Sequence, residues 1–128
     1  ITNQPGIAKG FLTVPELEKI HDEINFKLQK KTGYFFDKFY YCPHYPTRGF
    51  KGEIKEFKIN CSCRKPKPGL FKKAILEFNL KPKNILTVGN SNVDLVAAKR
   101  SGIIKNFIVK NNKNRSYNLL YKSLLKKN

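Results

Sequence analysis

The sequence predicts an α/β fold with a Rossmann-like parallel sheet and helices on its faces. Two observations predict it: short apolar runs alternate with amphipathic stretches, and polar turns follow the apolar runs. The 128 residues suit one compact domain spanning 1–128, and an apolar fraction of 40% is enough for a packed core. Ligands of such sheets bind beyond the carboxyl ends of the strands, so binding residues are expected in the turns at 2–6 and 88–92.

The first helix is expected over residues 10–31. Thr13 and Glu16 match a capping box, and apolar residues recur at helical spacing from Leu17 to Leu28. His21 lies among charged residues of this helix, and we expect it to face solvent. The further expected elements, in chain order, are a strand at 36–42, a helix at 68–80, a strand at 84–88, a helix at 93–102 closed by Gly102, a strand at 104–109 and a helix at 116–127.

The chain is strongly basic. Lys and Arg total 26 against 9 Asp and Glu, which gives a net charge of +17. A field of that size attracts phosphates and polyanions. Because the lysines are spread along the whole chain, we interpret them as solvated faces. The alternative is a zinc-stabilised basic module that binds nucleic acid, and its affinity would fall steeply with salt.

The cysteine count bears on the compartment. Three cysteines, an odd number, argue against a disulfide framework and favour a reducing compartment, hence the cytoplasm. No apolar run approaches the ~20 residues of a membrane helix, and the N-terminus shows no signal-peptide pattern. We therefore expect a cytoplasmic protein with no membrane contact.

All three cysteines lie in the loop at 42–63, which also holds a histidine. Cys42 with His44, and Cys61 with Cys63, are spaced two apart, so each pair can point to one side of an extended segment. Three thiolates and one imidazole make a closed tetrahedral zinc site, which predicts a structural role. Free buried cysteines beside a surface histidine are the alternative.

Three polar groupings could handle a phosphate. Arg64 and Lys65 of CRKPKPG are stiffened by neighbouring prolines before a helix, although an ordinary basic loop explains them as well. The TNQPG turn offers a hydroxyl and two amides, or is simply a turn. Asn90, Ser91 and Asp94 either offer oxygens to Mg²⁺ or serve as polar residues at a helix start.

Four segments, TNQPGIAKG, YYCPHYP, CSCRKPKPG and VGNSNVDLVAAKRSG, occur in this order. Together they resemble the zinc-loop phosphatases of the haloacid dehalogenase superfamily, over roughly the first hundred residues. The resemblance implies that family's fold with an inserted zinc loop. It also implies Mg²⁺-dependent hydrolysis of a small sugar phosphate through an aspartyl-phosphate intermediate. We expect the protein to be a monomer. Heptose 1,7-bisphosphate is the expected substrate and histidinol phosphate the alternative.

The resemblance also assigns roles to residues of this sequence. Thr2 matches the hydroxyl that binds the transferring phosphoryl group, and Lys65 the lysine that pairs with the nucleophile and the phosphate. Arg64 matches the residue that reads the remote part of the substrate. The other matches are Asn3, Gln4 and Pro5 lining the substrate pocket, Ser91 abutting it, Cys42, His44, Cys61 and Cys63 as zinc ligands, and Asn90, with Asp94 as a further candidate, for magnesium.

The sequence departs from the family pattern in three places. The family's nucleophile lies in an Asp-x-Asp segment on a strand upstream of the TNQ turn, and no Asp-x-Asp occurs here. We therefore expect an N-terminally truncated fragment or degenerate copy that leaves two strand edges unpaired and is inactive; a non-catalytic scaffold that keeps the zinc loop is a further alternative. Asn90 replaces an aspartate, which should weaken magnesium binding, and Lys9 replaces an arginine.

Overall fold

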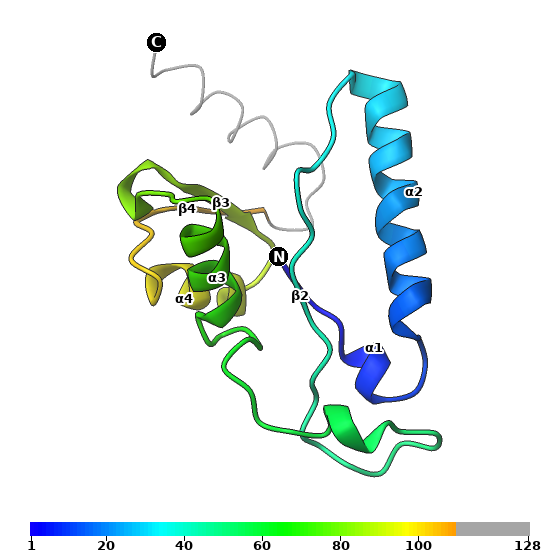
Figure 1. The fold of residues 1–128 in the computed structure, drawn as a ribbon. Coiled ribbons are helices and arrows are strands. Elements are labelled where there is room, and N and C mark those ends of the chain that lie inside the picture. Colours follow the sequence, from blue (N-terminus) through cyan, green and yellow to red (C-terminus); the bar gives the residue numbers. More distant parts are fainter. Residues whose placement is uncertain (110–128) are drawn as a thin grey trace. The chain divides into compact units, whose positions relative to one another are not determined.

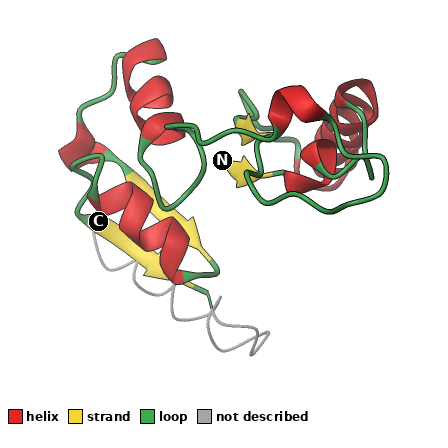
Figure 2. Cartoon of the chain, turned by 90° about the horizontal axis from the view of Figure 1, so that it is seen from below, coloured by secondary structure: helices red, strands yellow, loops and turns green. Residues whose placement is uncertain are grey.

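The computed structural model describes residues 1–109 (Figure 1). The helix expected at 116–127 lies outside the described residues. The described chain is an α/β fold with parallel strand pairing, as the sequence predicts. It divides into two compact units, the first comprising Ile1–Arg64 and the second beginning at Lys65. Each unit has its own two-stranded sheet (Figure 2), and a single domain over 1–128 stays a prediction.

The first unit contains one long helix and a short parallel strand pair. Its elements are β1 (Thr2–Asn3), α1 (Pro5–Ala8), α2 (Val14–Thr32), β2 (Tyr41–Cys42) and the 3-10 helix η1 (Lys55–Phe57). The predicted capping box is confirmed: the Thr13 side chain accepts from the Glu16 backbone, and the Glu16 carboxylate accepts from the Thr13 backbone. Gly33, with φ at 78°, ends α2 in the left-handed conformation that glycine favours.

The strand expected at 36–42 is only two residues long, and the sequence reasoning was wrong about its length. Phe36 does not join the ladder, because its backbone is bonded to a helix side chain. The Phe36 N–H donates to Asn25 Oδ1 at 2.8 Å, and Asn25 Nδ2 donates to the Phe36 carbonyl at 3.0 Å. The Asn25 side chain thus occupies the backbone groups of Phe36, and the ladder with β1 pairs only Tyr41 and Cys42 with Thr2 and Asn3.

His21 is buried, so the expectation that it faces solvent was wrong. His21 is 8% exposed, and its ring stacks on that of Phe39 with the ring centroids 4.2 Å apart. The physical reason is helical spacing: His21 lies four residues after the buried Leu17 and therefore shares its face. Burial lowers the pKa of His21 below its ordinary value.

The second unit is a β-α-β arrangement preceded by a helix. Its elements are α3 (Gly69–Glu77), the 3-10 helix η2 (Pro82–Asn84), β3 (Leu86–Gly89), α4 (Asn92–Lys99) and β4 (Lys105–Ile108). β3 and β4 pair in parallel through the α4 crossover, with Leu86 opposite Lys105. Ala97, Ala98 and Ile103 form the buried core of this unit with Leu70 of α3.

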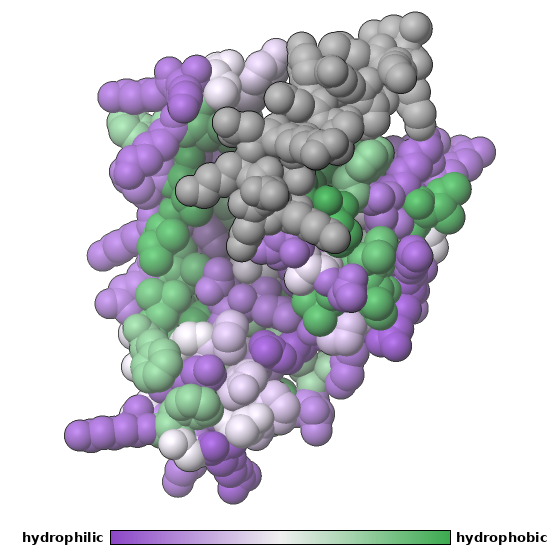
Figure 3. All heavy atoms as spheres, turned by 180° about the vertical axis from the view of Figure 1, so that it is seen from behind, coloured by the Kyte–Doolittle hydropathy of each residue, from purple (hydrophilic) through white to green (hydrophobic). Residues whose placement is uncertain are grey.

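Apolar surface remains exposed in both units. Leu86 and Val88 of β3 are 36% and 51% exposed, and Ile20 and Ile24 of α2 are 46% and 41% exposed. Figure 3 shows apolar patches among hydrophilic side chains on the face it draws. Among residues 1–109, β1 pairs with β2 alone and β3 with β4 alone, so β1 and β3 each keep one edge without a strand neighbour.

Candidate metal centre and phosphate-binding residues

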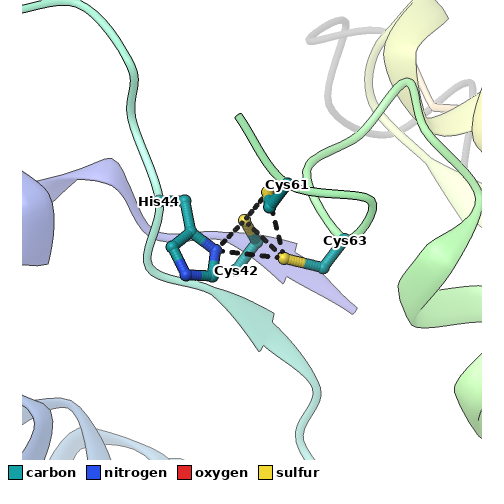
Figure 4. A group of neighbouring side chains, drawn as sticks. All are labelled: Cys42, His44, Cys61 and Cys63. Atoms are coloured by element: carbon teal, nitrogen blue, oxygen red, sulfur yellow. Dashed lines mark hydrogen bonds between the residues drawn. The ribbon is translucent and has the colours of Figure 1, made fainter. Parts of the chain in front are cut away.

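The four predicted zinc ligands meet in one cluster in the first unit (Figure 4). Cys42 ends β2, His44 follows two residues later, and Cys61 and Cys63 follow η1. Their ligand atoms all lie within 4.8 Å of one another. Cys63 Sγ is 3.1 Å from Cys42 Sγ and 3.2 Å from both Cys61 Sγ and His44 Nδ1.

The donor set fits a structural zinc ion. Zn–S bonds of about 2.3 Å in a tetrahedron place sulfur atoms about 3.7 Å apart, and the three S–S distances here are 3.1, 3.2 and 3.5 Å. Burial raises the pKa of Cys42 and of Cys63, whereas the hydrogen bonds from Cys63 and from the Arg64 backbone lower the pKa of Cys61 against its own burial. Three sulfurs and one nitrogen would complete four-coordination around a bound zinc ion and would leave no open position for catalysis.

A buried ion pair, which the sequence reasoning did not find, fastens the interior of the same loop. Lys58 Nζ lies 3.1 Å from Glu53 Oε2, with side-chain exposures of 2% and 22%, and also donates to the Thr47 carbonyl. Glu53 Oε2 accepts from the backbone N–H groups of Gly49 and Phe50 at 3.0 and 3.2 Å. The backbone bond from Phe50 and the charge of Lys58 hold the pKa of Glu53 below its ordinary value.

Arg64 and Lys9 both lie against an aromatic pair beside this cluster. The rings of Tyr45 and Phe50 have centroids 5.9 Å apart. Lys9 Nζ lies 4.5 Å from each ring centroid, and the Arg64 guanidinium carbon 4.9 Å from that of Tyr45. Arg64 also donates to the His44 carbonyl at 3.2 Å, so the expected substrate-reading residue is attached directly to the metal loop.

The TNQPG residues form β1 and the start of α1, so the prediction that they make a turn after a strand was wrong. Thr2 and Asn3 form the strand, Gln4 precedes α1 and donates its backbone N–H to the Cys42 carbonyl at 2.8 Å, and Pro5 begins α1. A cavity of about 290 Å³ lies beside Thr2 and Gln4, and most of its other lining residues are apolar or aromatic: Ile1, Ile24, Phe36 and Phe39, with His21 and Lys38. Asn3 and Pro5 do not line this cavity.

In the second unit, Asp94 is engaged by several partners at once. Lys65 Nζ lies 2.5 Å from Asp94 Oδ1, with side-chain exposures of 10% and 14%. Asp94 Oδ2 accepts from the Ser91 hydroxyl at 2.7 Å and from the backbone N–H groups of Asn90 and Ser91 at 3.1 Å. Burial alone would raise the pKa of Asp94, but the bonds from Lys65 and Ser91 outweigh it and hold the pKa below its ordinary value.

Ser91 and Asp94 thus form the capping box of α4, which is the helix-start alternative that the sequence left open. Asn90 is exposed at the end of β3. Gly89 explains the close packing here, because a Cβ at this position would lie 2.5 Å from Asp94 Cβ. Magnesium binding by Asn90 or Asp94 stays a prediction, and an Asp94 ligand would have to share its carboxylate with Lys65.

Comparison with known proteins agrees with the motif resemblance. A family model described as HAD-hydrolase-like matches residues 62–123. Curated heptose-1,7-bisphosphate 7-phosphatases of Haemophilus ducreyi, Photorhabdus laumondii and Pasteurella multocida are 35%, 36% and 37% identical over 113, 110 and 113 residues. The alignments cover 88%, 86% and 88% of this chain and 59%, 57% and 58% of the relatives, so the chain spans about three fifths of their length.

A solved structure is similar as well. The crystal structure of a D,D-heptose 1.7-bisphosphate phosphatase from B. bronchiseptica, complexed with magnesium and phosphate, is 25% identical with a TM-score of 0.75. The match covers 98% of this chain and 72% of that chain. Within residues 1–109, no helix has the length and apolar character needed to cross a membrane.

Proposed function

We propose that this chain carries the zinc loop and phosphate-binding residues of a heptose-bisphosphate phosphatase, because residues 62–123 match the HAD-hydrolase-like model and the chain is similar to curated phosphatases of this kind. The reaction is hydrolysis of the 7-phosphate of D-glycero-D-manno-heptose 1,7-bisphosphate. The relatives' names include both the alpha and the beta anomer, so the proposal covers both. We also propose that the protein is a monomer and works in the cytoplasm.

One observation carries this proposal. The curated relatives that share 30–37% identity over most of this chain are named for the same 7-phosphatase activity. The Cys42–His44–Cys61–Cys63 cluster supports the proposal independently, because neither the basic composition of the chain nor its α/β fold requires three thiols and an imidazole to lie together.

We propose that zinc holds the loop at 42–63 and has no part in the chemistry. The ligands are the Sγ atoms of Cys42, Cys61 and Cys63 and Nδ1 of His44. Zinc at this point ties β2 to the segment after η1 and so fixes the backbone of His44, to which Arg64 is bonded. Removing the metal should therefore loosen Arg64.

The proposed substrate contacts follow from the groups that these residues carry. Thr2 offers a hydroxyl to the transferring phosphoryl group, and Lys65 offers an ammonium that Asp94 already holds in one orientation. Arg64 binds the remote part of the substrate through its guanidinium fork. Asn3, Gln4 and Pro5 line the sugar pocket and Ser91 abuts it, as the family resemblance implies.

Magnesium is the second proposed metal. Asn90 supplies an amide oxygen at the end of β3, where the ion would neutralise phosphate charge. The B. bronchiseptica enzyme was solved with magnesium and phosphate, which supports this assignment. An amide instead of a carboxylate removes one negative charge, so we propose weak magnesium binding.

The 128 residues contain three aspartates, Asp22, Asp37 and Asp94, and no Asp-x-Asp pair. Asp22 lies on α2, and Asp94 is committed to the capping box of α4 and to Lys65. These three aspartates do not provide the two carboxylates, spaced as in Asp-x-Asp, of which one would attack phosphorus and the other would protonate the leaving group. We propose that these residues bind the phosphoester and do not turn it over by themselves.

The test is a binding titration paired with an activity assay. Zinc-loaded chain is titrated calorimetrically with D-glycero-D-manno-heptose 1,7-bisphosphate, and phosphate release is followed with and without Mg²⁺. We expect saturable binding, weakened about tenfold by Arg64→Ala, and no phosphate release. Lys51→Met is the control, because Lys51 is an exposed loop lysine. Equal binding by wild type and Arg64→Ala would contradict the substrate assignment, and Mg²⁺-dependent release would contradict the inactivity.

A further inference from the structure

We propose that Lys58 and Glu53 are a positioning pair: they lock the Tyr45–Phe50 ring pair in place, and this platform sets Arg64 and Lys9 toward a phosphate of the substrate. The proposal rests on the proposed function for the identity of the ligand. The lock itself rests only on contacts within the first unit.

The burial of Lys58 is the first step. A lysine side chain that is only 2% exposed is costly unless it is paired, and Lys58 meets both the Glu53 carboxylate and the Thr47 carbonyl. Glu53 in turn closes the turn at 49–53 through two backbone N–H groups. The Lys58–Glu53 pair therefore binds the loop backbone at three points: the Thr47 carbonyl and the N–H groups of Gly49 and Phe50.

The second step is the contact between the lock and the rings. Lys58 Nζ lies 4.9 Å from the Phe50 centroid and 5.5 Å from that of Tyr45, within the range of cation–π attraction. Phe50 is also held edge-on by Phe11, with centroids 6.2 Å apart. The ring pair is thus in contact with a buried cation whose ammonium is held by Glu53 and Thr47.

The third step is the charge that the platform presents. Lys9, Lys58 and Arg64 all lie against the two rings, and Glu53 is the carboxylate that pairs with Lys58. Among residues 1–109, neither Lys9 nor Arg64 forms an ion pair. Two cations held by rings without a counter-ion form a preorganised place for an anion such as a phosphate.

A purely structural role for Lys58 would stabilise the loop without affecting Arg64. The two roles differ in the surroundings of the Arg64 guanidinium, which ring currents of Tyr45 report directly. Arginine side-chain Nε–Hε signals are recorded on the zinc-loaded full chain, and the Arg64 signal is assigned with Arg64→Lys. The variants are Lys58→Met, Lys58→Arg as conservative rescue, and Lys51→Met, which removes an exposed charge from the same loop.

We expect Lys58→Met to move the Arg64 signal toward that of a free arginine and to weaken heptose 1,7-bisphosphate binding about tenfold. Lys58→Arg should keep both near wild type, as should Lys51→Met. An unmoved Arg64 signal in Lys58→Met overturns the positioning role. If Lys58→Met does not fold, Glu53→Gln serves instead and must shift the signal in the same direction. A shifted signal without bisphosphate binding by wild type supports the lock and refutes the proposed function instead.

Discussion

Chelating the proposed zinc perturbs the point on which the loop at 42–63 depends most. The buried apolar residues of the first unit are Ile7, Ala8, Leu17, Tyr40 and Cys42. Between Cys42 and Cys61 the only buried residue is Lys58. The loop therefore lacks an apolar core of its own.

The expected magnitude follows from that composition. Structural zinc contributes about 10–16 kcal/mol in small peptides, whereas a whole domain is stable by about 5–15 kcal/mol. Without zinc, the loop would keep the Lys58–Glu53 pair and the backbone bond from Ile54 to Ala8 at 3.1 Å. Those contacts are worth a few kcal/mol at most, so we expect the loop to open.

Hydrogen–deuterium exchange read by mass spectrometry, before and after EDTA, measures this opening. Exchange at 45–60 should accelerate by orders of magnitude, while the β3–β4 amides serve as an internal reference. Cys63→Ser should reproduce the effect without EDTA, and Ser62→Ala, at an exposed position between two ligands, should not. Less than one zinc per folded chain by elemental analysis, or unchanged exchange at 45–60 after EDTA, would refute the zinc assignment.

Three further predictions concern single residues. Asp94→Ala removes the α4 cap and the carboxylate that pairs with the nearly buried Lys65, and should cost about 2–4 kcal/mol in urea unfolding. A loss under 1 kcal/mol would contradict the ion pair. Burial lowers the pKa of His21, so the unfolded chain binds the proton more tightly and the free energy of unfolding should fall as pH drops below 6.5. His21→Phe should make the free energy of unfolding less dependent on pH in this range. An unchanged pH dependence would contradict the role given to His21. Asn90→Asp should tighten Mg²⁺ binding about tenfold by calorimetry; unchanged affinity would remove Asn90 from the site.

Local chemistry explains where prediction succeeded. The capping box at Thr13 and Glu16 is confirmed because it depends on residues three apart. The metal donors converge as expected because their spacing already puts two on one side of each segment. The strand expected at 36–42 is shorter because its ladder pairs only Tyr41 and Cys42 with β1, while Asn25, eleven residues before Phe36, bonds the Phe36 backbone.

The sequence by itself determined the α/β class, the three cysteines and one histidine of the candidate metal site, and the resemblance to zinc-loop phosphatases, since each depends on residue type and short spacing. Only the tertiary structure decided that Lys58 is buried against Glu53, that His21 stacks on Phe39 and that Lys65 pairs with Asp94, 29 residues away. From the sequence alone, a lysine or a histidine is expected to be exposed to solvent, because the residues that surround it are not known. Burial and pairing are properties of what surrounds a side chain, and a linear pattern does not contain them.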